Sequence, residues 1–191
     1  MNKKILSIKE AIKVSQKLRK QNRSIVVVGG FFDILHLGHI KFLEKSKKYG
    51  DYLFVLLEDD AKTKKKGAKR PINSQKDRAK ILSALPSIDY IIMLKNMTNN
   101  QFYDRIMVKM QPDIIATTYG DPHVKHKRRQ AKLVRGRVVY AIKRIDDHST
   151  TKYTKLINVN PAPFRHEALS STRKGTLVAH KAGLGVLKGA G

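Results

Sequence analysis

Short apolar, β-branched runs alternate with amphipathic stretches over most of this chain, and this alternation constrains its fold more than any other feature. The runs SIVVVGG, YLFVLLED and IDYIIML contain few polar residues. Such runs are typical of strands that are buried in a parallel sheet. The expected strands are 24–30, 52–59, 88–94, 112–120 and 137–144. Helical segments between these strands predict an α/β protein, a Rossmann-like three-layer sandwich with a five-stranded parallel sheet.

The segments between the strands have helical periodicity. The expected helices are 5–20, 39–49, 73–85, 100–110 and 123–135. The third helix has a start signal, because Ser74 can cap it and Asp77 follows three residues later, as in a variant of the capping box. Helices that connect parallel strands lie on both faces of the sheet, so this pattern completes the three layers.

Polar segments follow several of the expected strands. They are His36, the loop 61–70, Tyr119–Asp121 and the loop 146–151. Because ligands of open α/β sheets bind beyond the carboxyl ends of the strands, we expect these four segments to converge on one ligand site.

The stretch GGFFDILHLGH places two histidines, His36 and His39, at the first turn of a helix. Free backbone N–H groups and the positive end of the helix dipole favour anions there, above all phosphates. Gly38 between the histidines is expected to let the chain turn and to bring the backbone close to a phosphate. The alternative of a zinc site is disfavoured, because no third and fourth ligand follows at a usable spacing.

The charge of the chain is strongly positive: 40 Lys and Arg against 15 Asp and Glu give a formal net charge of +25. Much of this positive charge lies in two runs without Asp or Glu, residues 61–70 and 123–137. Three interpretations remain open: a solvated basic surface, a site for a phosphate-rich ligand, or a face that binds nucleic acid weakly and without sequence preference. No stacking-aromatic pattern accompanies the lysines, which disfavours a dedicated single-strand binder.

The chain contains no cysteine and no apolar run near the roughly 20 residues of a membrane span. We therefore expect a cytoplasmic protein without a membrane partner. Three parts are expected: an N-terminal helix over 1–24 packed on the domain, the domain itself over 25–159, and a flexible, basic, glycine-rich tail over 160–191.

Three segments carry a resemblance to the nucleotidyltransferase superfamily. GGFFDILHLGH resembles its H-x-G-H signature, and KGAKRPINSQKDRAKILSALPSIDYII is similar to its K-G, R-P, L-x-x-L and V-D block. DDHSTTKYTKLI resembles the closing S-T-T-K segment. A second hydroxyl-rich segment, LSSTRKG, is a weaker candidate because no strand precedes it. The nearest branch contains the D-glycero-D-manno-heptose 1-phosphate adenylyltransferases and the similar glycerol-3-phosphate cytidylyltransferases.

The resemblance implies an enzyme that transfers a nucleoside monophosphate from a Mg²⁺-bound triphosphate to a phosphorylated acceptor and releases pyrophosphate. It implies catalytic roles for His36, His39 and Lys66, no protein-bound metal, and a homodimer. Residues implied in nucleotide binding are Gly30, Phe31, Phe32, Asp33, Gly38, Arg78, Gly120, Asp121, Ser149, Thr150 and Thr151. Arg78 and the lysines of the loop are expected to clamp phosphates, and Ser149–Thr151 to form a second anion site at a helix terminus.

The identity of the substrates is left open by the residues. The helix before the first strand favours the heptose type, hence ATP and a sugar 1-phosphate. Gly29-Gly30-Phe31 and Thr117–Asp121 depart from that type, however, and the S-T-T-K ending suits cytidylyl transfer to glycerol 3-phosphate equally well. The alternative of another class is a non-catalytic module that binds nucleotide or nucleic acid.

Overall fold

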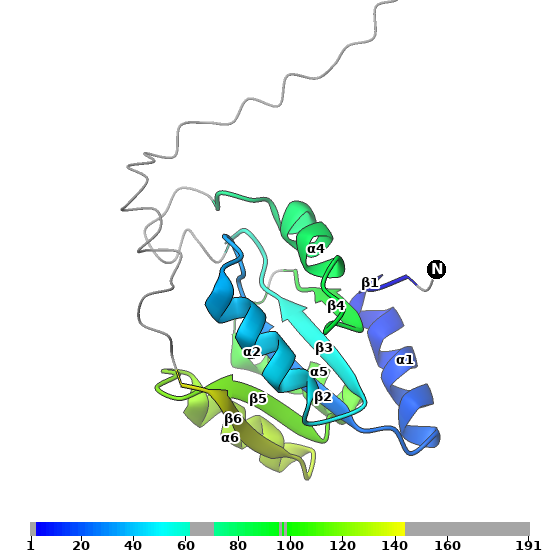
Figure 1. The fold of residues 1–191 in the computed structure, drawn as a ribbon. Helices are drawn as coiled ribbons and strands as arrows, with labels where there is room; N and C mark the ends of the chain where they lie inside the picture. Colours follow the sequence, from blue (N-terminus) through cyan, green and yellow to red (C-terminus); the bar gives the residue numbers. More distant parts are fainter. Residues whose placement is uncertain (1–2, 62–70, 96, 98, 144–191) are drawn as a thin grey trace, which may run out of the picture. The chain divides into compact units, whose positions relative to one another are not determined.

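The computed structural model describes residues 3–61, 71–95, 97 and 99–143. These residues form a six-stranded parallel sheet with the order β1-β4-β3-β2-β5-β6 (Figure 1). The strands are β1 (Ile5–Leu6), β2 (Ile25–Gly30), β3 (Tyr52–Leu57), β4 (Tyr90–Met93), β5 (Ile114–Thr118) and β6 (Arg137–Ile142). The order reverses between β2 and β5, and the carboxyl ends of these two central strands are where ligands of such sheets bind.

Helices cover both faces of this sheet, as the alternating pattern predicted. They are α1 (Ile8–Lys20), α2 (Leu37–Lys47), α4 (Gln75–Ser83), α5 (Asn100–Met110) and α6 (Val124–Leu133). The core is correspondingly divided into two clusters, one containing side chains of α1, α5 and α6 and the other containing side chains of α2 and α4. Within the described residues, no helix is both long enough and apolar enough to cross a membrane.

The sheet has six strands where five were predicted. Ile5 and Leu6 were expected in the first helix, but they pair with Ile91 and Ile92 at the edge of β4. The helix begins only after Ser7, whose side chain accepts from the backbone N–H of Glu10 in a capping box. A two-residue strand is too short to show a period of two, so only the open edge of β4 reveals it.

The helix starts confirm one expectation and correct another. Ser74 caps α4 by accepting from the backbone N–H of Asp77 at 3.2 Å, as predicted. Helix α2, however, starts two residues before the predicted 39 and has His36 as its N-cap residue. Gly38 therefore lies within the first turn of α2, so the turn that was expected of it is helical, and its expected approach to a phosphate stays a prediction.

Candidate active site

A cavity of about 560 Å³ lies at the carboxyl ends of β2, β3 and β5, between the sheet, α2, α5 and α6. Its lining changes from apolar residues at the sheet to polar residues at the strand ends and on α5 and α6. The polar lining residues are Glu58, Asn100, Tyr103, Thr117, Thr118, Asp121, His123, His126, Lys127 and Gln130, together with His39. This is the edge of the sheet at which the sequence predicted that polar segments converge.

His39 of the H-x-G-H segment lines one wall of this site and His36 stacks on it, and we call this pair the histidine wall. Their rings are stacked, with centroids 3.7 Å apart and an interplanar angle of 22°. His36 occupies the N-cap position of α2 in an extended backbone conformation, and His39 lies three residues later in the first turn. The N-terminus of α2 carries the positive end of the helix dipole, so the wall favours an anion, although the backbone N–H groups of His39 and Ile40 already donate to the His36 carbonyl at 2.9 and 3.2 Å.

Burial makes His39 hard to protonate. The pKa of His39 is lowered to about 4, chiefly by burial and further by the charge of His36, while a hydrogen bond to the backbone of Ile34 opposes the shift. His39 is therefore neutral at pH 7 in the unliganded protein. A neutral imidazole still offers one N–H to a phosphate oxygen, and the negative charge of a bound triphosphate would raise its pKa.

This low pKa predicts a pH-dependent stability. The unfolded chain, with an ordinary His pKa near 6.5, binds more protons than the folded chain between about pH 6.5 and pH 4. The contribution of neutral His39 to the free energy of unfolding is thus complete above pH 6.5. It is lost as the pH falls toward 4, and the total loss is at most about 3 kcal/mol. Urea unfolding at several pH values measures this effect. As the pH falls from 6.5 to 4, the free energy of unfolding should decrease less in His39→Phe than in the wild type. The exposed His123, changed to Gln, should leave the wild-type pH dependence intact.

The chain between β2 and α2 is shaped by a close contact of Gly30 with Phe32. The buried Phe32 has a left-handed backbone with φ 52°, which costs a residue other than glycine about 1–3 kcal/mol. Its ring lies edge-on to His39, with centroids 5.0 Å apart. A Cβ atom at Gly30 would lie 2.6 Å from that ring. Glycine at this position therefore lets the Phe32 ring support the histidine wall.

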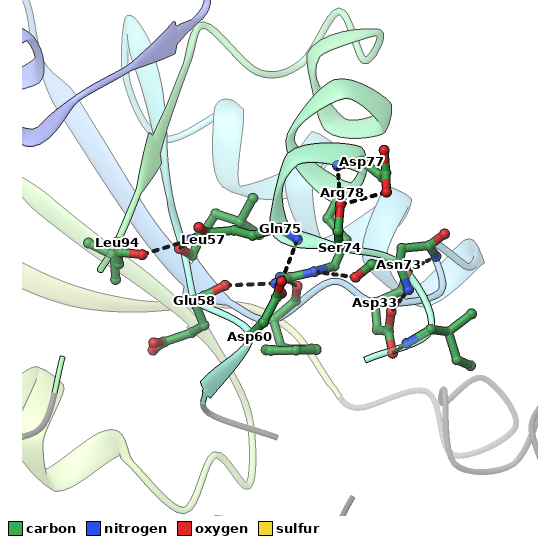
Figure 2. A network of polar contacts seen from close by, with 12 residues as sticks. Asp33, Leu57, Glu58, Asp60, Asn73, Ser74, Gln75, Asp77, Arg78 and Leu94 are labelled. Carbon is green, nitrogen blue, oxygen red and sulfur yellow. Dashed lines mark hydrogen bonds and ion pairs between the residues drawn. The ribbon is translucent and has the colours of Figure 1, made fainter. Parts of the chain in front are cut away.

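Arg78 joins the loops that follow β2 and β3 (Figure 2). Its Nε donates to the carbonyl of Asn73 at 3.1 Å, and Nη1 donates to the carbonyl of Phe31. Its Nη2 donates to the carbonyl of Glu58 at 3.0 Å and to Asp60 Oδ1 at 2.6 Å. The guanidinium also lies over the Phe31 ring, 4.0 Å from its centroid.

This position corrects the role that was predicted for Arg78. The residue is fully buried, and protein acceptors take up its donors on Nε, Nη1 and Nη2, so it does not offer them to a phosphate as expected. A buried cation needs such acceptors, and the carbonyls at the strand ends supply them. Arg78 positions the loops of the site.

Asp33 has a related structural role in the same region. Its carboxylate accepts from the backbone N–H groups of Ile72 at 3.0 Å and Asn73 at 2.8 Å, and Asn73 Nδ2 donates back to the carbonyl of Asp33 (Figure 2). The segment after β2 is thus bound to the segment before α4. These contacts give Asp33 a structural role, and its predicted part in nucleotide binding stays a prediction.

The opposite wall carries a carboxylate that the sequence-based prediction missed. The hydroxyl of Tyr103 on α5 lies 2.8 and 2.7 Å from the two carboxylate oxygens of Glu58. Asn100 Nδ2 lies 3.3 Å from His126 Nδ1, which joins α5 to α6. The sequence does show Glu58 directly after a buried strand, but it does not show the pairing with Tyr103, which is 45 positions further along the chain.

A lysine–aspartate pair completes this wall. Lys127 Nζ lies 2.7 Å from Asp121 Oδ2 and 2.9 Å from Thr117 Oγ1, with Lys127 and Asp121 side chains only 19% and 12% exposed. Burial alone would raise the pKa of Asp121, but hydrogen bonds from Lys127, Thr117 and the His123 backbone hold it below its ordinary value. The carboxylate thus pairs with the Lys127 ammonium at the cavity surface.

Apart from Asp33 and Arg78, the predicted site residues fall into three groups. Those that line the cavity are Gly30, Phe31, Phe32, His39 and Asp121. Those next to it are His36, which stacks on His39, Gly38 in the first turn of α2, and Gly120, whose φ of 74° forms the turn after β5. Lys66, Ser149, Thr150, Thr151 and the tail 160–191 lie outside the described residues, so their predicted roles are untested.

Comparison with curated proteins identifies relatives of part of the chain. It is 45% identical over 98 residues to the bifunctional protein HldE of Aliarcobacter butzleri, covering 51% of this chain and 21% of that protein. It is 41% identical over 113 residues to the HldE of Wolinella succinogenes, covering 59% and 23% respectively. The chain thus spans about a fifth of the length of these relatives.

Solved structures show the same arrangement. The lipopolysaccharide core biosynthesis protein of Thermoplasma volcanium is 31% identical, with a TM-score of 0.50, and the match covers 66% of this chain and 99% of that protein. The pantoate-beta-alanine ligase of Francisella tularensis has a TM-score of 0.52 at 15% identity, over 82% of this chain and 73% of the ligase. At that identity the second match shows a shared fold alone.

A family model that matches most of the chain, including the residues of the site, assigns the chain to a family. The profile of the cytidylyltransferase-like family matches residues 27–173, which include most of β2, the histidine wall and all of the cavity-lining residues. The match confirms the resemblance that the H-x-G-H, R-P and S-T-T-K segments carried. The chain belongs to the cytidylyltransferase-like family.

Proposed function

We propose that this chain transfers a nucleoside monophosphate, with AMP favoured, from a Mg²⁺-bound triphosphate to a sugar or polyol phosphate and releases pyrophosphate. One observation supports this most: the histidine wall at the N-terminus of α2 and the Glu58–Tyr103 pair face the same cavity. The first can hold phosphates, and the second can hold hydroxyl groups. The similarity to HldE proteins favours the adenylyl branch over the cytidylyl branch.

In the proposed reaction, an oxygen of the acceptor phosphate attacks the α-phosphorus. A new P–O bond forms, the bond from the α-phosphorus to the bridging oxygen breaks, and pyrophosphate leaves with Mg²⁺, which enters as part of the substrate. Both reactants are anions, so catalysis rests on positioning and on donors at the α-phosphate. His36 and His39 would supply these donors, with Lys66 as the expected third catalytic group. Ser149–Thr151 stay predicted ligands of the β- and γ-phosphates.

The opposite wall would orient the acceptor. A carboxylate repels a phosphate but accepts hydrogen bonds from sugar hydroxyls, so the hydroxyl groups should lie toward Glu58. The acceptor phosphate should lie toward Lys127, whose ammonium is at the cavity surface beside Asp121. This orientation would point the attacking oxygen away from Glu58. The homodimer that the resemblance implies also stays a prediction.

Glu58→Gln tests the acceptor wall. The variant keeps the size of the side chain but replaces a charged acceptor by a neutral amide, so the KM for the acceptor should rise by about tenfold. The KM for the triphosphate should stay within about twofold, which steady-state kinetics with each substrate varied in turn would show. Asp59→Asn, a neighbouring acid that is not a cavity-lining residue, is the matched control. An equal rise in both constants would contradict the assignment.

A pyrophosphate-release screen tests the function itself. It crosses the four nucleoside triphosphates, with Mg²⁺, against heptose 1-phosphate, glycerol 3-phosphate, phosphocholine and flavin mononucleotide. We expect turnover with ATP and a sugar 1-phosphate. Turnover with CTP and glycerol 3-phosphate alone would favour the cytidylyl alternative and keep the mechanism. Tight triphosphate binding without turnover in any combination would favour the non-catalytic module.

A further inference from the structure

Two tyrosines, one exposed and one partly buried, form an aromatic pair beside the most basic helix of the described chain. Tyr119 follows β5 and is 54% exposed, and Tyr140 lies on β6. Their rings are stacked with centroids 4.4 Å apart and an interplanar angle of 25°. A backbone hydrogen bond from Tyr119 N–H to the Ile142 carbonyl and a bond from Arg128 Nη2 to the Tyr140 hydroxyl, at 2.8 Å, hold the pair in place.

The surface around this pair is positively charged. Residues 123–143 contain no acid, and Lys125, Arg128 and Lys132 are exposed at spacings of three and four on α6, so they form one stripe. Acids compensate other cations of this helix, since Asp104 pairs with Arg129 and Asp121 with Lys127. We call Tyr119, Tyr140 and the stripe of Lys125, Arg128 and Lys132 the α6–β6 surface.

We propose that the α6–β6 surface binds single-stranded nucleic acid. The stripe would track successive phosphates, and an unpaired base would stack on the exposed face of Tyr119. Cations combined with an aromatic platform are what sequence-independent single-strand binding requires. A duplex could satisfy only the cations, because its bases are already stacked. The sequence alone predicted charge without aromatics, since Tyr119 and Tyr140 lie 21 residues apart and only the pairing of β5 with β6 brings them together.

Fluorescence anisotropy on the full chain tests this proposal with a labelled oligothymidylate, an oligouridylate and a duplex of equal length. We expect tighter binding of both single strands than of the duplex. Tyr119→Leu should weaken single-strand binding by about fivefold or more and leave duplex binding unchanged. Tyr140→Leu should act in the same direction, and the exposed Tyr119 preserves the test if the Tyr140 variant does not fold.

A charge-matched control separates this surface from the general charge of the protein. The double variant Lys125→Gln with Lys132→Gln should weaken the salt dependence of single-strand binding. The negative slope of log affinity against log salt should become less steep by about 0.7 for each phosphate that the variant no longer neutralises. Lys13→Gln with Lys17→Gln removes the same charge from exposed positions of α1. The α1 pair should change single-strand binding much less.

Three results would overturn the proposal. The first is equal affinity for single strand and duplex with no effect of Tyr119→Leu. The second is an equal effect of the α1 and α6 variants, which would mean binding by net charge alone. The third is complete displacement of the oligonucleotide by saturating triphosphate, which would place it in the cavity. That third result would leave the proposed transfer reaction intact, because the pyrophosphate-release screen measures that reaction independently.

Discussion

Replacing His39 with alanine is expected to lower kcat by about a hundredfold or more, with a similar loss for His36→Ala. Both rings stand at the N-terminus of α2, the positive end of the helix dipole, and they stack on one another with centroids 3.7 Å apart. A positioned donor that stabilises the charge developing at phosphorus contributes on this scale. The loss should appear in kcat more than in triphosphate affinity, because the charge it stabilises develops in the transition state.

Steady-state kinetics and triphosphate binding, measured on the same preparations, check this expectation. His123→Ala is the matched control, because it removes an exposed histidine from the opposite wall of the same cavity. Its kcat should stay within a few fold of the wild type. Near-wild-type turnover in both His36→Ala and His39→Ala would show that the histidines do not act in the reaction.

The second large effect concerns folding. Arg78→Met is expected to lower the free energy of unfolding by about 3–5 kcal/mol, the range for breaking a buried ion pair. The methionine fills a similar volume but leaves the carbonyls of Phe31, Asn73 and Glu58 without the donors that Arg78 supplies. Asp60 also loses its ion pair with Arg78, which measures 2.6 Å. Because these groups belong to the loops after β2 and β3, the loss should loosen the site together with the fold.

Urea unfolding of Arg78→Met against Lys80→Met measures this effect. Lys80 is exposed on the same helix, so its variant should change stability by less than about 0.5 kcal/mol. Arg78→Lys keeps the charge but not the fork of donors, and it should fall between the two. An Arg78→Met protein with wild-type stability and greatly reduced triphosphate affinity would restore the direct phosphate contact that the sequence suggested.

The two walls of the site differ in how far the sequence could predict them. The histidine wall is local: a strand, a short loop and a helix start within 15 residues of one another, from Ile25 to His39. The wall of Glu58, Tyr103 and Lys127 is assembled from β3, α5 and α6, which are neighbours only in the folded sheet. A pattern of the first kind can be recognised in a sequence, whereas the second depends on the strand order.

Burial separates the cationic residues in the same way. The sequence shows Arg78 as one of many basic residues before an apolar run, and the loops that enclose it lie 18 to 47 residues away. Whether such a side chain binds a phosphate or donates to backbone carbonyls depends on which strand ends surround it in the fold. The structure places it among the carbonyls, which turned a predicted ligand into a residue that positions the loops.

The sequence by itself determined the α/β class, five of the six strands, the positions of the helices and the family. These depend on periodicities of two and 3.6 residues and on motifs whose members are near one another in the chain. The tertiary structure alone decided that Ile5–Leu6 form an edge strand, that Arg78 is buried, and that Tyr119 stacks on Tyr140. Each of these depends on a partner that is distant in the chain, and the order of the strands in the sheet selects that partner.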